Sequence, residues 1–292
     1  MVTIENIIEN DALFKGKHTK YEFLKDGIEN KTYKVDCGNK SYCVRIINSK
    51  QRFSFGLDTK KEALACQQAS LLSIAPAVYN IDNPADYLIT DFFPGKSLTG
   101  EEACNSEIIK KYICAIKLIH DHVKVDINFS VYDRFYKYIH TAKKFDMKLP
   151  NWVNKLMEQV EKIKEIRSDS KLLYHVFCHN DIWHENILFD GNKICLIDWE
   201  FCGYGDGFFD FAHISRRGML FEEKKFMLTT YFGYFDMEMW RMLQLMEYIS
   251  RAYDAIWQIF HSCVFDDIDT RKFFTDSANK IIEDLFNEYR IE

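Results

Sequence analysis

The sequence predicts an α+β protein with two lobes, a small N-terminal antiparallel sheet with one helix and a larger, mostly helical C-terminal lobe. Three observations support this fold class. Short apolar segments separated by turn residues occupy residues 21–92. From about residue 103, apolar residues recur at helical spacing. Phe93-Pro94-Gly95 interrupts both patterns. We therefore divide the chain into lobes 1–95 and 96–292.

The N-terminal lobe begins with three predicted strands. They cover residues 21–24, 32–36 and 41–47, joined by turns at 27–30 and at Gly38-Asn39. Successive side chains of a strand alternate between its faces, so Tyr42, Val44 and Ile46 share one face. Arg45 is then an isolated cation on the opposite face.

A helix and a hairpin complete this lobe. Asp58 is expected to cap a helix that runs from about residue 61 to 72 and ends before Ala75-Pro76. Glu62 in its first turn offers Arg45 a carboxylate partner. Residues 78–81 and 87–92 then predict a hairpin around Asn83-Pro84.

The C-terminal lobe alternates helices with one short β region. Apolar spacing predicts helices at 103–122, 151–166, 221–233, 237–264 and 271–289. Between the second and third of these, strands are expected at 172–177, 186–189 and 193–197. A turn at Asp190-Gly191-Asn192 joins the last two strands, and Asp198 follows the final one.

Composition and charge exclude several functional classes. The 292 residues carry 38 basic against 44 acidic side chains, a net charge of −6, so no basic field favours nucleic-acid binding. A small cationic substrate suits this charge better. Nine cysteines without any CxxC pair predict reduced thiols in a cytoplasmic protein. We expect neither an export signal nor a membrane span, and the sequence does not indicate the oligomeric state.

Residues 179–200, HNDIWHENILFDGNKICLIDWE, carry the predicted chemistry. Asp181 can orient or deprotonate an acceptor hydroxyl, and His179 is expected to brace the loop. Asn186 and Asp198 offer the oxygen ligands that Mg²⁺ prefers, as transfer of a phosphoryl group from Mg-ATP requires. Alone, each Asp or Asn is more often a turn former or a cap. The ordered series of strand, loop, strand, turn and strand favours the phosphotransfer hypothesis.

This ordered set resembles the protein-kinase-like small-molecule kinases, namely the aminoglycoside phosphotransferase and choline/ethanolamine kinase families. The resemblance spans nearly the whole chain and implies a two-lobed protein-kinase-like fold that uses ATP and Mg²⁺. It implies that Asp181 is catalytic and that Asn186 and Asp198 bind metal. Asp210, in GFFDFA, would steady the catalytic loop. The IDWE wording followed by FCGYGDGFFDFAHIS looks most like the choline kinase branch.

Two matches concern the nucleotide. In CVRI, Arg45 stands where protein kinases have the strand lysine, which implies contact with the α- and β-phosphates and an ion pair with Glu62. The GIENKTYKV stretch, with Asn30, looks like the family's nucleotide-covering turn. An ordinary hairpin turn would have the same composition.

The acceptor pocket follows from the same resemblance. Choline-binding members hold the quaternary ammonium with aromatic rings, which implies roles for Tyr204, Tyr253 and Trp257. Glu200 would add a negative charge toward the substrate. Core packing is the alternative for an aromatic stripe on a long helix.

One departure bears on the substrate. Choline kinases tend to have two tryptophans three residues apart here, but this chain has Asp254 before Trp257. A carboxylate favours a protonated amine that can donate hydrogen bonds. We expect a kinase that transfers the γ-phosphate of ATP to the hydroxyl of choline or a related amino alcohol. The alternatives are an ethanolamine, thiamine or aminoglycoside kinase, or a catalytically inactive binding protein.

Overall fold

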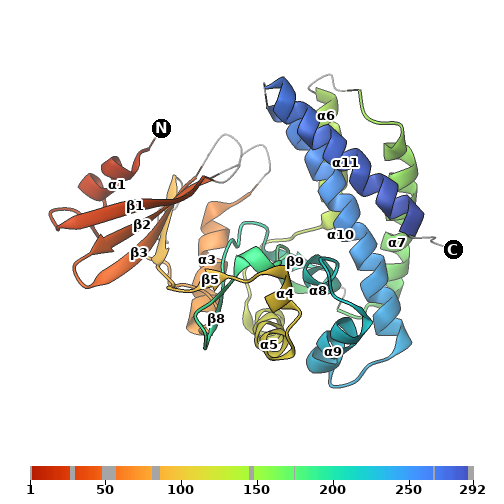
Figure 1. The fold of residues 1–292 in the computed structure, drawn as a ribbon, viewed down its shortest axis with the longest axis horizontal. Helices are drawn as coiled ribbons and strands as arrows, with labels where there is room; N and C mark the ends of the chain where they lie inside the picture. Colours follow the sequence, from red (N-terminus) through yellow and green to blue (C-terminus); the bar gives the residue numbers. More distant parts are fainter. Residues whose placement is uncertain are drawn as a thin grey trace. The chain divides into compact units, whose positions relative to one another are not determined.

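The α+β fold class is confirmed, with a four-stranded antiparallel sheet near the N-terminus and a helical C-terminal part (Figure 1). The computed structural model describes residues 2–26, 30–47, 57–80, 86–144, 148–173, 175–265 and 267–288. The chain forms two compact units, residues 1–127 with 181–203, and residues 128–180 with 204–292. The boundary at residue 95 is a different division and stays a prediction.

The main sheet of the first unit has the strand order β1-β2-β3-β4. Its strands are β1 (Thr19–Asp26), β2 (Asn30–Cys37), β3 (Lys40–Ile47) and β4 (Tyr87–Asp91), and every neighbouring pair is antiparallel. Cys37 pairs with Lys40, so Gly38-Asn39 is a two-residue hairpin loop. Gly38 has φ +62°, a conformation that glycine adopts without a steric penalty.

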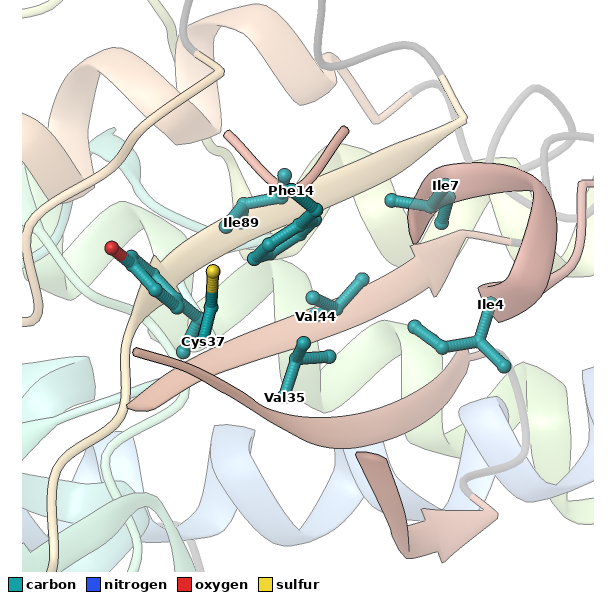
Figure 2. Close-up of a cluster of buried hydrophobic side chains, with 8 residues drawn as sticks. Ile4, Ile7, Phe14, Val35, Cys37, Val44 and Ile89 are labelled. Carbon is teal, nitrogen blue, oxygen red and sulfur yellow. The ribbon is translucent and has the colours of Figure 1, made fainter. Parts of the chain in front are cut away.

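One face of this sheet packs against the N-terminal segment (Figure 2). Ile4 and Ile7 of α1 (Ile4–Asn10), together with Phe14, lie over Val44 and its neighbours on the strands. The cluster is completed by Val35, Cys37, Tyr42 and Ile89. The predicted apolar face of β3 is therefore the buried one at Tyr42 and Val44.

The opposite face packs against α3 (Thr59–Leu71), which begins as predicted. The Asp58 side chain accepts hydrogen bonds from the backbone N–H groups of Lys60 and Lys61. Ala63 of this helix packs with Ile47 and Leu88 of the sheet. Arg45, which points to this face, therefore meets the helix that carries Glu62.

A second small sheet in the first unit has the order β5-β7-β8. It contains β5 (Lys96–Ser97), β7 (Ile187–Phe189) and β8 (Ile194–Leu196), with α4 (Gly100–Ala103) and α5 (Ser106–His122) in the same unit. The predicted turn between β7 and β8 is confirmed, because Asp190 Oδ1 accepts the N–H groups of Asn192 and Lys193. Leu196 N donates to Ile74 O at 2.8 Å, which ties β8 to the segment after α3.

The second unit is mainly helical. Its helices are α6 (Val131–Lys144), α7 (Trp152–Ser170), α8 (Phe208–Ser215), α9 (Phe221–Phe232), α10 (Met237–Val264) and α11 (Ile268–Glu288). β6 (Val176–Cys178) pairs with β9 (Gly203–Gly205), most of which belongs to this unit. The long helices α10 and α11 lie side by side (Figure 1).

Most predicted elements are present, and three helices were missed. The helices predicted at 221–233, 237–264 and 271–289 correspond to α9, α10 and α11. The sequence patterns did not single out α1, α6 or α8. In the predicted 78–92 hairpin, Val78 forms one bridge with Thr90, while residues 81–85 lie outside the described ones.

Two further expectations concern the whole chain. All nine cysteines are free thiols. Within the described ranges, no helix combines the length and the apolar character needed to cross a bilayer.

Candidate active site

The predicted catalytic loop lies in the first unit, just before β7. Asn186, at the end of the 3₁₀ turn η1 (His184–Asn186), is 7% exposed. Its Nδ2 donates to the Asp181 carboxylate at 2.7 Å and to the Asp181 backbone carbonyl at 2.9 Å. These bonds use the amide nitrogen of Asn186, so its amide oxygen is left to receive a cation.

Asp198 is joined to this loop through the backbone. Ile197 N donates to Asn186 O at 3.0 Å, so the residue before Asp198 is bonded to the predicted metal-binding Asn. Asp198 itself has φ +67°, the left-handed conformation that is uncommon for residues other than glycine. Such backbone strain persists where the surroundings hold it, and it occurs often at functional sites. The structure therefore brings Asp181, Asn186 and Asp198 onto adjacent segments of one unit.

Arg45 on β3 links two carboxylates of the same unit. Its Nη1 donates to Asp198 Oδ1 at 2.7 Å, and its Nη2 pairs with Glu62 Oε1 of α3. The ion pair between Arg45 and Glu62 that the sequence led us to expect is present. Glu62 is 1% exposed, so its charge depends on this partner.

The charge state of Arg45 follows from its neighbours. Burial disfavours the charged guanidinium, but the carboxylates of Glu62, Asp198 and Glu200 outweigh burial and raise the pKa of Arg45. Glu200, predicted to face the substrate, is buried and lies close enough to act on Arg45. The site keeps a permanent cation among three acidic groups.

Asn30 begins β2 and pairs with Ile47 of β3. Its side-chain oxygen Oδ1 is buried and meets no hydrogen-bond donor among the residues that the structure describes. The rest of the predicted covering turn, residues 27–29, lies outside those residues.

In the second unit, His179 and Asn180 are held by Asp210 of α8. The backbone N–H of His179 donates to Asp210 Oδ2 at 3.0 Å, and that of Asn180 donates to Oδ1 at 2.6 Å. Asn180 has φ +64° and directly precedes Asp181. His179 and Asp210 are both completely buried. This geometry agrees with the expectation that Asp210 steadies the loop, and it places His179 in the core.

The aromatic residues predicted for the acceptor pocket have different surroundings in the second unit. Tyr253 is 7% exposed, and its hydroxyl lies 3.0 Å from that of Tyr138. Trp257 is partly exposed and packs with its ring centroid 3.8 Å from that of His261. Tyr204 lies on β9, where its ring stacks on His175 at 5.3 Å. Of the two α10 rings, Trp257 is the more accessible.

Asp254, which stands where the family tends to have tryptophan, is paired with two arginines. Its Oδ2 accepts Arg216 Nη2 at 2.5 Å and lies 3.4 Å from Arg217 Nη2. Burial would raise the pKa of Asp254, but Arg216, His213 and Arg217 together lower it. Sequence reasoning missed both arginines, because no local pattern connects a pair after α8 with a carboxylate on α10.

Comparisons with known proteins support a family assignment. The family model described as choline/ethanolamine kinase matches residues 21–264. Protein LicA of Haemophilus influenzae is 31% identical over 135 residues, which are 45% of this chain and 38% of that protein. The match thus spans less than half the length of this relative.

Solved structures share the fold. The choline kinase LicA from Streptococcus pneumoniae has a TM-score of 0.77 at 18% identity, covering 96% of this chain and 99% of that one. An ADP-bound aminoglycoside phosphotransferase has a TM-score of 0.67 at 16% identity, covering 98% and 99%. At these identities the likeness shows the fold alone, whereas the family model covers most of the chain. The chain therefore belongs to the choline/ethanolamine kinase family.

Proposed function

We propose that this protein transfers the γ-phosphate of Mg-ATP to the hydroxyl of a small amino alcohol, with choline as the first candidate and ethanolamine as the second. The observation that carries the proposal is the connected set in the first unit. Asp181 is bonded to Asn186, the Asn186 carbonyl is bonded to Ile197, and Asp198 is bonded to Arg45 and through it to Glu62. These are the groups that phosphoryl transfer requires.

The donor set fits Mg²⁺. Asn186 Oδ1 and the second carboxylate oxygen of Asp198 are hard oxygen ligands, and Mg²⁺ binds through few protein oxygens and keeps several waters. When bound, Mg²⁺ would neutralise charge on the phosphates of the nucleotide. The ADP-bound phosphotransferase of the same fold supports a nucleotide at this site.

Each residue of the chain then has a defined task. Asp181 orients the acceptor hydroxyl and takes its proton, and the hydrogen bond from Asn186 holds its carboxylate in place. Arg45 contacts the α- and β-phosphates and remains paired with Glu62. Asn30, whose Oδ1 is buried without a donor, contacts the nucleotide. His179 supports the loop from within the core.

Glu200, Tyr204, Tyr253, Asp254 and Trp257 are proposed to shape the acceptor pocket. Asp254 does so through Arg216 and Arg217, since its Oδ2 already accepts from both. This pairing weakens the argument that Asp254 receives hydrogen bonds from a protonated amine. It therefore supports choline, which cannot donate such bonds, over ethanolamine.

A substrate panel tests the proposal. ADP release is measured with Mg-ATP and choline, ethanolamine, thiamine or an aminoglycoside, always beside an Asp181→Ala variant. We expect the highest kcat/KM with choline and a loss of about 10²-fold or more in the variant. Turnover of no acceptor above the Asp181→Ala background would favour the inactive binding protein, and a preference for an aminoglycoside would favour that branch of the superfamily.

A further inference from the structure

The second unit contains a fully buried ion pair that the proposed chemistry does not use. Arg167 on α7 is 0% exposed and Asp206 is 7% exposed. The pair is bidentate, with Arg167 Nε donating to Oδ2 at 2.6 Å and Nη2 to Oδ1 at 2.7 Å. Nη2 also donates to Leu172 O at 2.8 Å, and the guanidinium lies 4.8 Å from the centre of the Phe208 ring. Replacing such a pair by apolar residues is often no less stable, so overall stability alone does not account for it.

The pair fixes the start of α8. Asp206 Oδ1, the oxygen that accepts from Arg167 Nη2, also accepts the backbone N–H of Phe208 at 3.0 Å. The adjacent Gly207 N donates to Leu173 O at 2.7 Å, in the segment that follows α7. The first turn of α8 is therefore held to the C-terminal end of α7 by a charged pair and a backbone bond.

The same turn of α8 holds the residues before Asp181. Asp210 lies four residues after Asp206, about one helical turn along the chain. Its two carboxylate oxygens accept the N–H groups of His179 and Asn180. Asn180 is in the left-handed conformation, φ +64°, which costs free energy unless its surroundings hold it. A shift of the α8 start would move both acceptors away from the strained residue that precedes Asp181.

We infer that Arg167 is a positioning residue for the catalytic loop and acts through Asp206, the first turn of α8 and Asp210. Its kinetic consequence rests on the proposed function, while its structural consequence does not. Arg167 contacts none of the residues to which we assign chemistry, so any effect on turnover passes through this chain of bonds.

The first test is hydrogen exchange, which needs no enzymatic activity. In Arg167→Met, the amides of His179 and Asn180 are expected to exchange about tenfold faster or more than in the unmodified protein, because local opening frees them. Lys224→Met is the matched control. It breaks another ion pair, Lys224 with Glu247, whose carboxylate is 2% exposed and which joins α9 to α10. The control should leave these two amides unchanged.

The second test is kinetic. In Arg167→Met, kcat is expected to fall about tenfold or more with little change in the KM for Mg-ATP, and Arg167→Lys should recover part of the loss. A merely structural role would lower the amount of folded enzyme and leave the kcat per folded molecule unchanged, as expected for Lys224→Met.

The outcomes separate the two hypotheses. Equal exchange of His179 and Asn180 in Arg167→Met and Lys224→Met overturns the inference, whatever the activity. Faster exchange in a protein that phosphorylates no acceptor would support the positioning and contradict the proposed function. Where Arg167→Met does not fold, Asp206→Asn compared with Glu247→Gln decides in the same way, because asparagine retains an acceptor for Phe208 N.

Discussion

Arg45 Nη1 donates to Asp198 Oδ1 across 2.7 Å while Nη2 of the same guanidinium pairs with Glu62. One side chain on β3 thereby joins α3 to the loop that follows β8. The planar fork of arginine allows two carboxylates to be bound in fixed directions, which the single ammonium of lysine does not. Arginine at this position is thus matched to the two acidic groups around it.

Arg45→Lys is expected to lower kcat/KM for Mg-ATP by about 10- to 100-fold, because one ammonium cannot keep both Glu62 and Asp198 in place. Steady-state kinetics with varied ATP measure the effect. Lys40→Met is the control, since it removes a cation that pairs with Asp91 on the same sheet. A change in Arg45→Lys no larger than in this control would contradict the proposed role.

Asn186→Ala removes one proposed oxygen ligand and the hydrogen bond to Asp181. We expect the Mg²⁺ concentration that gives half-maximal activity to rise about tenfold, with a lower kcat as the Asp181 carboxylate loses its partner. Titration of activity with Mg²⁺ at fixed ATP measures both effects. Asn192→Ala, in the exposed β7–β8 turn, should behave like the unmodified protein. An unchanged Mg²⁺ requirement in Asn186→Ala would remove this residue from the metal site.

Asp254→Asn tests how this residue affects acceptor choice. Because Asp254 accepts from Arg216 and Arg217, the variant should raise the KM values of choline and ethanolamine by similar factors. The free energy of unfolding should fall by about 1–3 kcal/mol, as a partly buried ion pair loses one charge. Kinetics with both alcohols and urea denaturation give these values. A selective increase for ethanolamine would show that the carboxylate binds the amine directly.

His261 predicts a pH dependence of stability. Burial lowers its pKa to about 4 from the usual 6.5. Between these values the unfolded chain binds a proton that the folded protein excludes, so stability rises with pH in this window and is lost as pH falls. The contribution is about 1.4 kcal/mol per pH unit.

Thermal denaturation of His261→Phe between pH 7 and pH 5 should therefore show a smaller decrease in Tm than the unmodified protein. His122→Gln, which changes an exposed histidine, is the control. The same slope in all three proteins would show that His261 does not contribute in this way.

Much of the fold could be predicted because its signals are local. Asp58 caps α3 through bonds to residues two and three positions away, and the Gly38-Asn39 turn joins adjacent strands. The three missed helices lack such signals. α8 is short and buried on all sides, with no amphipathic period to detect, and α1 spans only seven residues.

The sequence by itself determined the order of chemical groups from Arg45 to Asp198 and, through it, the family. The tertiary structure decided how far each charge is already satisfied, since Asp254 with Arg216 and Arg167 with Asp206 are pairs separated by 38 and 39 residues. Neighbouring positions specify strands, turns and caps, but the partner of a buried charge depends on which helices pack together. That packing is settled only when the whole core forms.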